Sequence, residues 1–160
     1  MDLSHFSLDS KVWVYPIKAT LNASQVSILD EKLAEFMGKW KAHGAPVTAA
    51  YKILDNRFIV ISADANCTAA SGCSIDSMRK NVSQALNSID SDISDFSSIY
   101  FIKDNDVLEV SRPEFAELKS SGQIKDNDKV FNITPANLKD FLTNGICLEF
   151  KDSWHSSVFK

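Results

Sequence analysis

The chain has 160 residues, of which 44% are hydrophobic and 24% are charged, and its formal net charge is −4 at pH 7. This length and composition are those of one globular domain, or of a core with a small appendage. The weakly acidic balance excludes electrostatic steering of the whole molecule toward nucleic acid or anionic membranes, and the longest apolar run is too short to span a bilayer.

The first third of the chain predicts a strand, a helix and a hairpin. Lys11–Ile17 is β-branched and aromatic, which is typical of a strand. A helical stripe follows, made of Val26, Leu29, Leu33, Phe36, Met37 and Trp40. Then "VTAAYKIL" and "RFIVISA" flank Asp55-Asn56, which predicts a hairpin with a two-residue turn. The second hairpin strand is apolar on both faces, so we expect it at the centre of a sheet.

A second helix and a further strand complete a recognisable order of elements. The second helical stripe consists of Ile75, Met78, Val82, Leu86 and Ile89. "IYFI" (Ile99–Ile102) then predicts a strand. The order β-α-β-β-α-β is that of the ferredoxin-like fold, an antiparallel sheet with two helices on one face. We therefore expect an α+β protein with a ferredoxin-like core over residues 10–103 and a small α/β C-terminal extension over 104–160.

The C-terminal extension carries clear helix signals. "SRPE" is a capping box, in which the Ser111 hydroxyl and the Glu114 carboxylate each accept from a free backbone N–H. "TPANLKDFLTNG" predicts a compact helix with Thr134 as its cap and Pro135 in its first turn. "KDNDVLEV", "KVFNI" and "ICLEF" predict short strands around these helices.

The first strand has two apolar faces. Trp13 and Tyr15 share one face, and Val12 and Val14 share the other. Helices can cover only one of them, so the other must meet a partner surface or the C-terminal part of the chain. Basic residues do not cluster near Trp13, which argues against a stacking platform for nucleic acid.

Several stretches resemble a family of small uncharacterised bacterial proteins that are often labelled as ABC transporter ATPases. They are "VWVYP", "WKAHGAPVTAAYKI", "RFIVISAD", "ASGCSIDS" and the terminal "DSWH". The chain has no G-x-x-x-x-G-K-[ST] phosphate loop, so its residues do not support an ATPase activity. The resemblance therefore implies no catalytic residues.

A second resemblance covers Tyr100–Asn132. "YFIKDNDVLEVSRPEFAELKSSGQIKDNDKVFN" is similar to GYF-type interaction modules in its strand–turn–strand, its helix with an "L…SG.I" ending and its short "D..VF" strand. The aromatic residues that usually follow in those modules are displaced or missing after Phe131. The resemblance implies a role in binding a protein partner.

Cys73 is the first candidate for chemistry, because "SGCSID" places it at the start of a helix, where the dipole favours the thiolate form. A thiol-dependent enzyme would use Cys73 as nucleophile and His43 as base, with Asp76 or His155 as an orienting or auxiliary group. Asp76 opposes a thiolate. The competing interpretations are a small buried Cys73, a His43 that only suits a helix C-terminus and a His155 in a solvated tail.

The same loop is a candidate binding site for a ligand. Ser71, Gly72, Cys73 and Ser74 are small residues that let a ligand approach backbone N–H groups, and Asp64 ends the preceding strand. We expect no metal, because the cysteine spacing is too wide for a structural zinc site. An Asp64–Asp76 pair for Mg²⁺ is the weaker alternative to ordinary loop and helix-start carboxylates. No cofactor is expected.

These observations favour a cytoplasmic, non-enzymatic binding or adaptor protein with a protein partner. The alternative is the thiol-dependent enzyme. Three cysteines do not form a disulfide framework, which is typical of a reducing compartment. Neither nucleic acid nor a membrane is expected as a partner.

Overall fold

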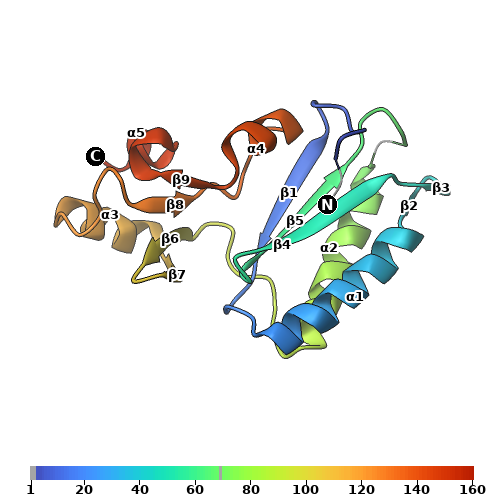
Figure 1. The fold of residues 1–160 in the computed structure, drawn as a ribbon, viewed down its shortest axis with the longest axis horizontal. Coiled ribbons are helices and arrows are strands. Elements are labelled where there is room, and N and C mark those ends of the chain that lie inside the picture. The colour runs from blue at the N-terminus through green and yellow to red at the C-terminus, as the bar shows by residue number, and fades with distance from the viewer. Residues whose placement is uncertain (1–2, 69) are drawn as a thin grey trace.

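The computed structural model describes residues 3–68 and 70–160 and confirms a mixed α+β protein (Figure 1). The elements in chain order are β1 (Lys11–Pro16), α1 (Ala23–Lys39), β2 (Lys41–Ala42), β3 (Ala45–Pro46), β4 (Ala49–Leu54), β5 (Phe58–Ala63), α2 (Gly72–Asn87), β6 (Ile99–Lys103), β7 (Asp106–Val110), α3 (Arg112–Ser120), β8 (Lys129–Phe131), α4 (Leu138–Asn144), β9 (Cys147–Glu149), the 3-10 helix η1 (Phe150–Asp152) and α5 (His155–Val158).

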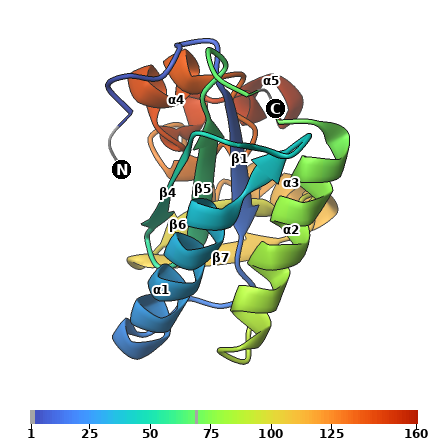
Figure 2. The ribbon, with the colours of Figure 1, turned by 90° about the vertical axis from the view of Figure 1, so that its right-hand side faces the viewer.

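The first sheet is antiparallel and has the order β1-β5-β4, so β5 takes the predicted central position. α1 and α2 lie side by side on one face of this sheet (Figures 1 and 2). The helices and the sheet enclose a core that includes Leu29, Leu33, Ile59, Ile61 and Met78, all of which are at most 1% exposed. The two predicted helical stripes thus supply the helix side of this core.

Local chemistry explains where these elements begin and turn. Asn22 caps α1 and forms a capping box with Gln25, whose side chain accepts from the Asn22 N–H. Asp55 and Asn56 both adopt φ of 51°, which these residue types tolerate best after glycine. The hairpin is confirmed, but its loop has three residues, since Leu54 pairs with Phe58 and the Arg57 N–H donates to the Leu54 carbonyl.

The strand predicted to complete a ferredoxin-like sheet lies elsewhere, and this part of the prediction is wrong. Ile99–Ile102 falls in β6, which pairs with β7 and β8 in a second antiparallel sheet of order β7-β6-β8-β9. The chain leaves β1 before it can form a fourth strand there, because a turn at Asp95–Ser98 diverts it. The division at residues 103 and 104 stays a prediction; β6 precedes it and pairs with β7 and β8, which follow it.

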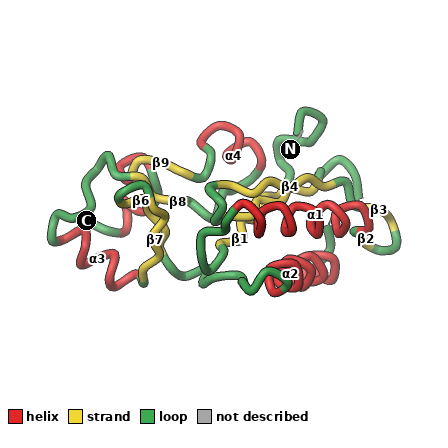
Figure 3. Tube along the Cα trace, turned by 60° about the horizontal axis from the view of Figure 1, so that its bottom comes forward, coloured by secondary structure: helices red, strands yellow, loops and turns green. Residues whose placement is uncertain are grey.

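The second sheet packs against the face of the first sheet that the helices leave open (Figures 1 and 3). Val14, Phe58 and Val60 of β1 and β5 form one buried cluster with Tyr100 and Phe131 of β6 and β8. The rings of Phe58 and Phe131 lie 4.6 Å apart. The Val12 and Val14 face of β1 therefore meets the C-terminal part of the chain, as one of the two interpretations predicted.

The C-terminal helices match the sequence signals only in part. Ser111 and Glu114 form the predicted capping box of α3. α4 begins later than predicted, at Leu138 with Asn137 as its cap, so Thr134 is not the cap. The Asn132 side chain accepts from both the backbone and the hydroxyl of Thr134, which holds this residue in the preceding loop.

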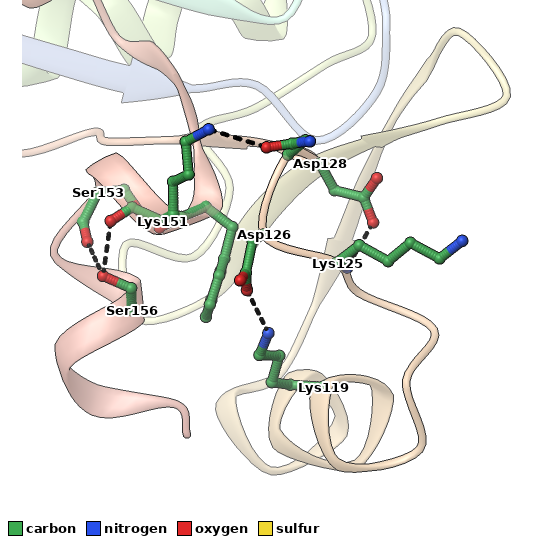
Figure 4. A network of polar contacts seen from close by, with 9 residues as sticks. Lys119, Lys125, Asp126, Asp128, Lys151, Ser153 and Ser156 are labelled. Carbon is green, nitrogen blue, oxygen red and sulfur yellow. Dashed lines mark hydrogen bonds and ion pairs between the residues drawn. The ribbon is translucent and has the colours of Figure 1, made fainter.

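Polar contacts join α3, the loop before β8 and the C-terminal end (Figure 4). The Lys119 ammonium lies 3.0 Å from Asp126, and the Lys125 N–H donates to Asp128. Ser156 donates to the carbonyls of Ser153 and Lys151. These contacts fix the short elements of the C-terminal end on one another.

Candidate functional site

The start of α2 is a well-capped helix. Ser71 is its cap: the Ser71 hydroxyl accepts from the Ser74 N–H at 3.4 Å, and the Ser74 hydroxyl donates to the Ser71 carbonyl at 2.9 Å. The Trp40 indole N–H donates to the Ser74 carbonyl at 3.0 Å, which ties α2 to the end of α1. The hydroxyls of Ser71 and Ser74 therefore serve the helix, while Gly72 is exposed beside them.

Cys73 is exposed, and the interpretation of a small buried cysteine is wrong. It lies in the first turn of α2, and its neighbours Gly72 and Asp76 are exposed as well. Asp76 lies just beyond the first turn rather than within it. Cys67, which donates to Asp64, is exposed too, so exposure does not single out Cys73.

Within residues 3–68 and 70–160, no hydrogen bond or ion pair brings a histidine to Cys73. His43 forms the tip of the β2–β3 hairpin with φ of 51° and is exposed, so it is not at the last turn of α1 as predicted.

His155 begins α5, and α5 lies at the opposite end of the molecule from α2 (Figure 1). His155 is 1% exposed and stacks on Trp154 at 3.9 Å between ring centroids, so it is not a solvated tail residue. Burial, followed by the charge of Arg112, lowers the pKa of His155 to about 4. A neutral, enclosed imidazole there cannot assist Cys73.

Asp64 anchors the N-terminal segment. Its carboxylate accepts from the N–H of Ser7 at 2.9 Å and of Asn66 at 3.1 Å, and these bonds hold its pKa below the ordinary value. Within the described residues, no group of three or more His, Cys, Asp or Glu side chains could hold a metal ion. The Asp64–Asp76 alternative gains no support from this arrangement.

A groove with a volume of about 390 Å³ lies beside β1 and is lined in part by α2. One wall is the α2 surface with Ile75, Asp76 and Arg79, and the other is the loop at Ile133–Pro135. Phe96 covers one end, and apolar surface predominates in the lining. Three segments far apart in the sequence thus meet around a single strand.

Aromatic contacts organise this end of the groove. The rings of Tyr15 and Phe96 meet edge to face with centroids 5.8 Å apart, and the Arg79 guanidinium lies 5.7 Å from the Phe96 centroid. Burial raises the pKa of Tyr15 to about 12, although the charge of Arg79 opposes this shift. The phenol is therefore neutral at physiological pH. Phe96 nevertheless remains 43% exposed.

Sequence reasoning found part of this groove. It located α2, where Asp76 was named as a candidate, and the two apolar faces of β1. It missed Phe96, because this residue is the only aromatic one in the polar stretch "SDISDFSS". An isolated aromatic residue forms no apolar pattern from which its contacts could be predicted. The position of Arg79 over an aromatic ring follows only from the fold.

Comparisons of the chain with known protein families, curated proteins and solved structures found no match. The two resemblances noted in the sequence therefore stay predictions. Among the residues that the structure describes, none belongs to a helix long and apolar enough to cross a membrane.

Proposed function

We propose that this chain is a non-enzymatic binding or adaptor protein and that the groove beside β1 receives part of a protein partner. The observation that carries the proposal is the convergence of α2, the Phe96 loop and Ile133–Pro135 on one strand, with an exposed aromatic ring at the end of the groove. Concave surfaces lined mainly by apolar groups, with a few polar groups, are the usual form of a binding site.

The charge and the cysteines support the choice of partner and compartment. The net charge of −4 disfavours a nucleic-acid partner, and the groove carries one carboxylate and one guanidinium in Asp76 and Arg79. All three cysteines are free thiols, which supports a cytoplasmic location.

The test compares two exposed apolar residues of similar exposure. Phe96 is 43% exposed in the groove, and Ile28 is 41% exposed on α1, outside the groove. The probe is the tightest-binding peptide from a displayed library of random ten-residue peptides, with affinity measured by fluorescence anisotropy. Phe96→Ala should raise the Kd by about tenfold or more, as loss of an aromatic anchor does, and Ile28→Ala should leave the Kd unchanged. Equal Kd values for both variants would contradict this location.

The alternative proposal is a thiol-dependent enzyme with Cys73 as nucleophile and His43 as base. One observation favours it, namely the exposed position of Cys73 in the first turn of the 16-residue helix α2. It requires Cys73 to react with iodoacetamide much faster than Cys67 near neutral pH. Mass spectrometry of each thiol over time measures this ratio, and a ratio near one eliminates the enzyme.

A further inference from the structure

β1 is an edge strand, and the groove runs along its outer edge. The direction of its backbone groups follows from three hydrogen bonds. The Ile17 N–H donates inward to the Arg57 carbonyl, at the end of the ladder with β5. The carbonyls of Ser10 and Pro16 accept from outside, from Leu138 and Ser94. Because backbone groups alternate along a strand, those of Val12 and Val14 also face outward.

The outward groups of Val12 and Val14 have no partner within residues 3–68 and 70–160, since β1 pairs only with β5. Val14 is 3% exposed and lines the groove, whereas Val12 is half-buried. Buried backbone polar groups in proteins are nearly always hydrogen-bonded. The N–H and carbonyl of Val14 therefore call for a hydrogen-bond partner, and those of Val12 continue the same row of outward groups.

The chain itself begins to pair with this edge and then departs. Ile17 and Ile93 form an antiparallel bridge, and the Ser94 N–H donates to Pro16. A strand continuing from Ser94 would lie along Val14 and Val12, but the Asp95 carboxylate accepts from the Ser97 N–H and turns the chain away. Ile93 and Ser94 therefore occupy one end of the position of a fourth strand, and the rest of that position, beside Val12 and Val14, is open.

We propose that a short, extended segment of a partner protein adds to β1 as a fourth strand and hydrogen-bonds to the backbone of Val12 and Val14. This inference rests on the proposed binding function and specifies how the groove binds. The open stretch between the bonds at Ser10 and Pro16 spans about 20 Å of strand, which suits a segment of roughly four to six residues. Backbone bonds would supply affinity and side-chain pockets would supply selectivity.

The two walls predict which side chains the segment carries. Residues opposite Val12 and Val14 would point to the same face as these valines, toward Ile133 and Pro135, and should be apolar. Alternate residues would point to the α2 side, toward Ile75 and Arg79. An apolar stem with a polar end fits that position. The expected segment alternates apolar and polar side chains.

The groove walls disfavour a second copy of this chain as the occupant of the same edge. α2 and the Ile133–Pro135 loop flank β1 on its two faces and line the groove beyond it. Pairing β1 with β1 of another copy would bring two sets of these walls together at one edge. A single extended segment avoids this collision, so the occupant is a peptide segment and not an identical sheet.

The test is an N-methyl scan of the tightest peptide from the random ten-residue library, measured by anisotropy against the full chain. Methylation removes one backbone N–H at a time. Methylation at each of two positions two residues apart should weaken binding by about tenfold, the effect of one lost hydrogen bond, while the position between them tolerates methylation. Uniform tolerance, together with sensitivity to Phe96→Ala, would overturn strand addition and leave groove binding intact. A library without any binder would overturn both proposals.

A matched pair of variants tests the protein side. Val12→Pro removes the outward N–H and keeps the inward ladder, as Pro16 already does four residues further along the same edge. Val12→Ala removes the side chain and keeps the N–H. Val12→Pro should weaken binding by about tenfold more than Val12→Ala. Equal losses would count against a backbone bond, and the N-methyl scan decides the question if Val12→Pro fails to fold.

Discussion

Arg57 and Glu109 form an ion pair that joins the β4–β5 loop to β7, and its removal gives the sharpest stability prediction. The Arg57 Nη2 lies 2.9 Å from Glu109 Oε2, and only 7% of the Arg57 side chain and 21% of the Glu109 side chain are exposed. Both Glu109 oxygens also lie 2.7 Å from the Ser94 hydroxyl, which donates to them. The pair therefore connects the first sheet, the second sheet and the segment that leaves β1.

Glu109→Ala should lower the free energy of unfolding by about 3 kcal/mol. Removing one partner of a buried pair typically costs about 3–5 kcal/mol, because the remaining charge stays buried without compensation. The lower end applies because part of Glu109 is open to water. The double variant Arg57→Met, Glu109→Met removes both charges and should recover most of the loss.

Urea unfolding followed by tryptophan fluorescence measures these values, provided that the slope with denaturant stays constant among the variants. Glu35→Ala is the control, since it breaks the Lys39–Glu35 pair whose side chains are 72% and 66% exposed, and its urea midpoint should not move. A loss below about 1 kcal/mol for Glu109→Ala, or a double variant as unstable as the single one, would refute the reasoning.

Three further predictions follow from the buried and exposed side chains. Burial holds His155 neutral with a pKa of about 4, against 6.5 for the free group, so the unfolded chain gains the proton first as pH falls. The contribution of neutral His155 to the free energy of unfolding is complete above about pH 6.5 and should fall by up to about 3 kcal/mol on reaching pH 4. The urea midpoint should therefore drop less between pH 7 and pH 4.5 in His155→Phe than in the unaltered protein. Cys73 and Cys67 should react with iodoacetamide at similar rates under the binding proposal, because both are exposed. Asp64→Ala should free the segment around Ser7, measured as faster cleavage there in limited proteolysis, whereas unchanged cleavage would mean that the segment is held by other contacts.

Elements with a strong local signal could be predicted from the sequence. Periodic apolar residues located α1 and α2, and residues that tolerate positive φ located the β4–β5 turn. The cap of α3 was predictable, because Ser111 and Glu114 form a capping box that the sequence shows directly. Thr134 does not cap α4, because the Asn132 side chain binds its backbone N–H and its hydroxyl. The sequence pattern does not show which of these local hydrogen bonds forms.

Pairing between distant strands could not be predicted in the same way. "IYFI" has the composition of a strand in any sheet, and nothing within it selects β1 over β7 and β8 as partners. The same holds for the candidate site. Cys73 and His43 carry reactive groups, but their distance depends on how a two-residue hairpin turns after α1. Residues such as Phe96 become meaningful only when the fold gives them neighbours.

The open edge of β1 follows from the same contacts that hold the two sheets together. Ser94 donates its N–H to Pro16 and its hydroxyl to Glu109, so a single residue ends the pairing with β1 and bonds to the second sheet. Glu109 in turn binds Arg57 beside the first sheet. Ser94 is held by Pro16 and Glu109, and Asp95 turns the chain away from β1. β6 therefore lies in the second sheet and does not pair with Val12 and Val14. The groove therefore results from the contacts that hold the two sheets together. Because no strand of the described chain pairs with this edge, a partner's segment is the element expected to complete it.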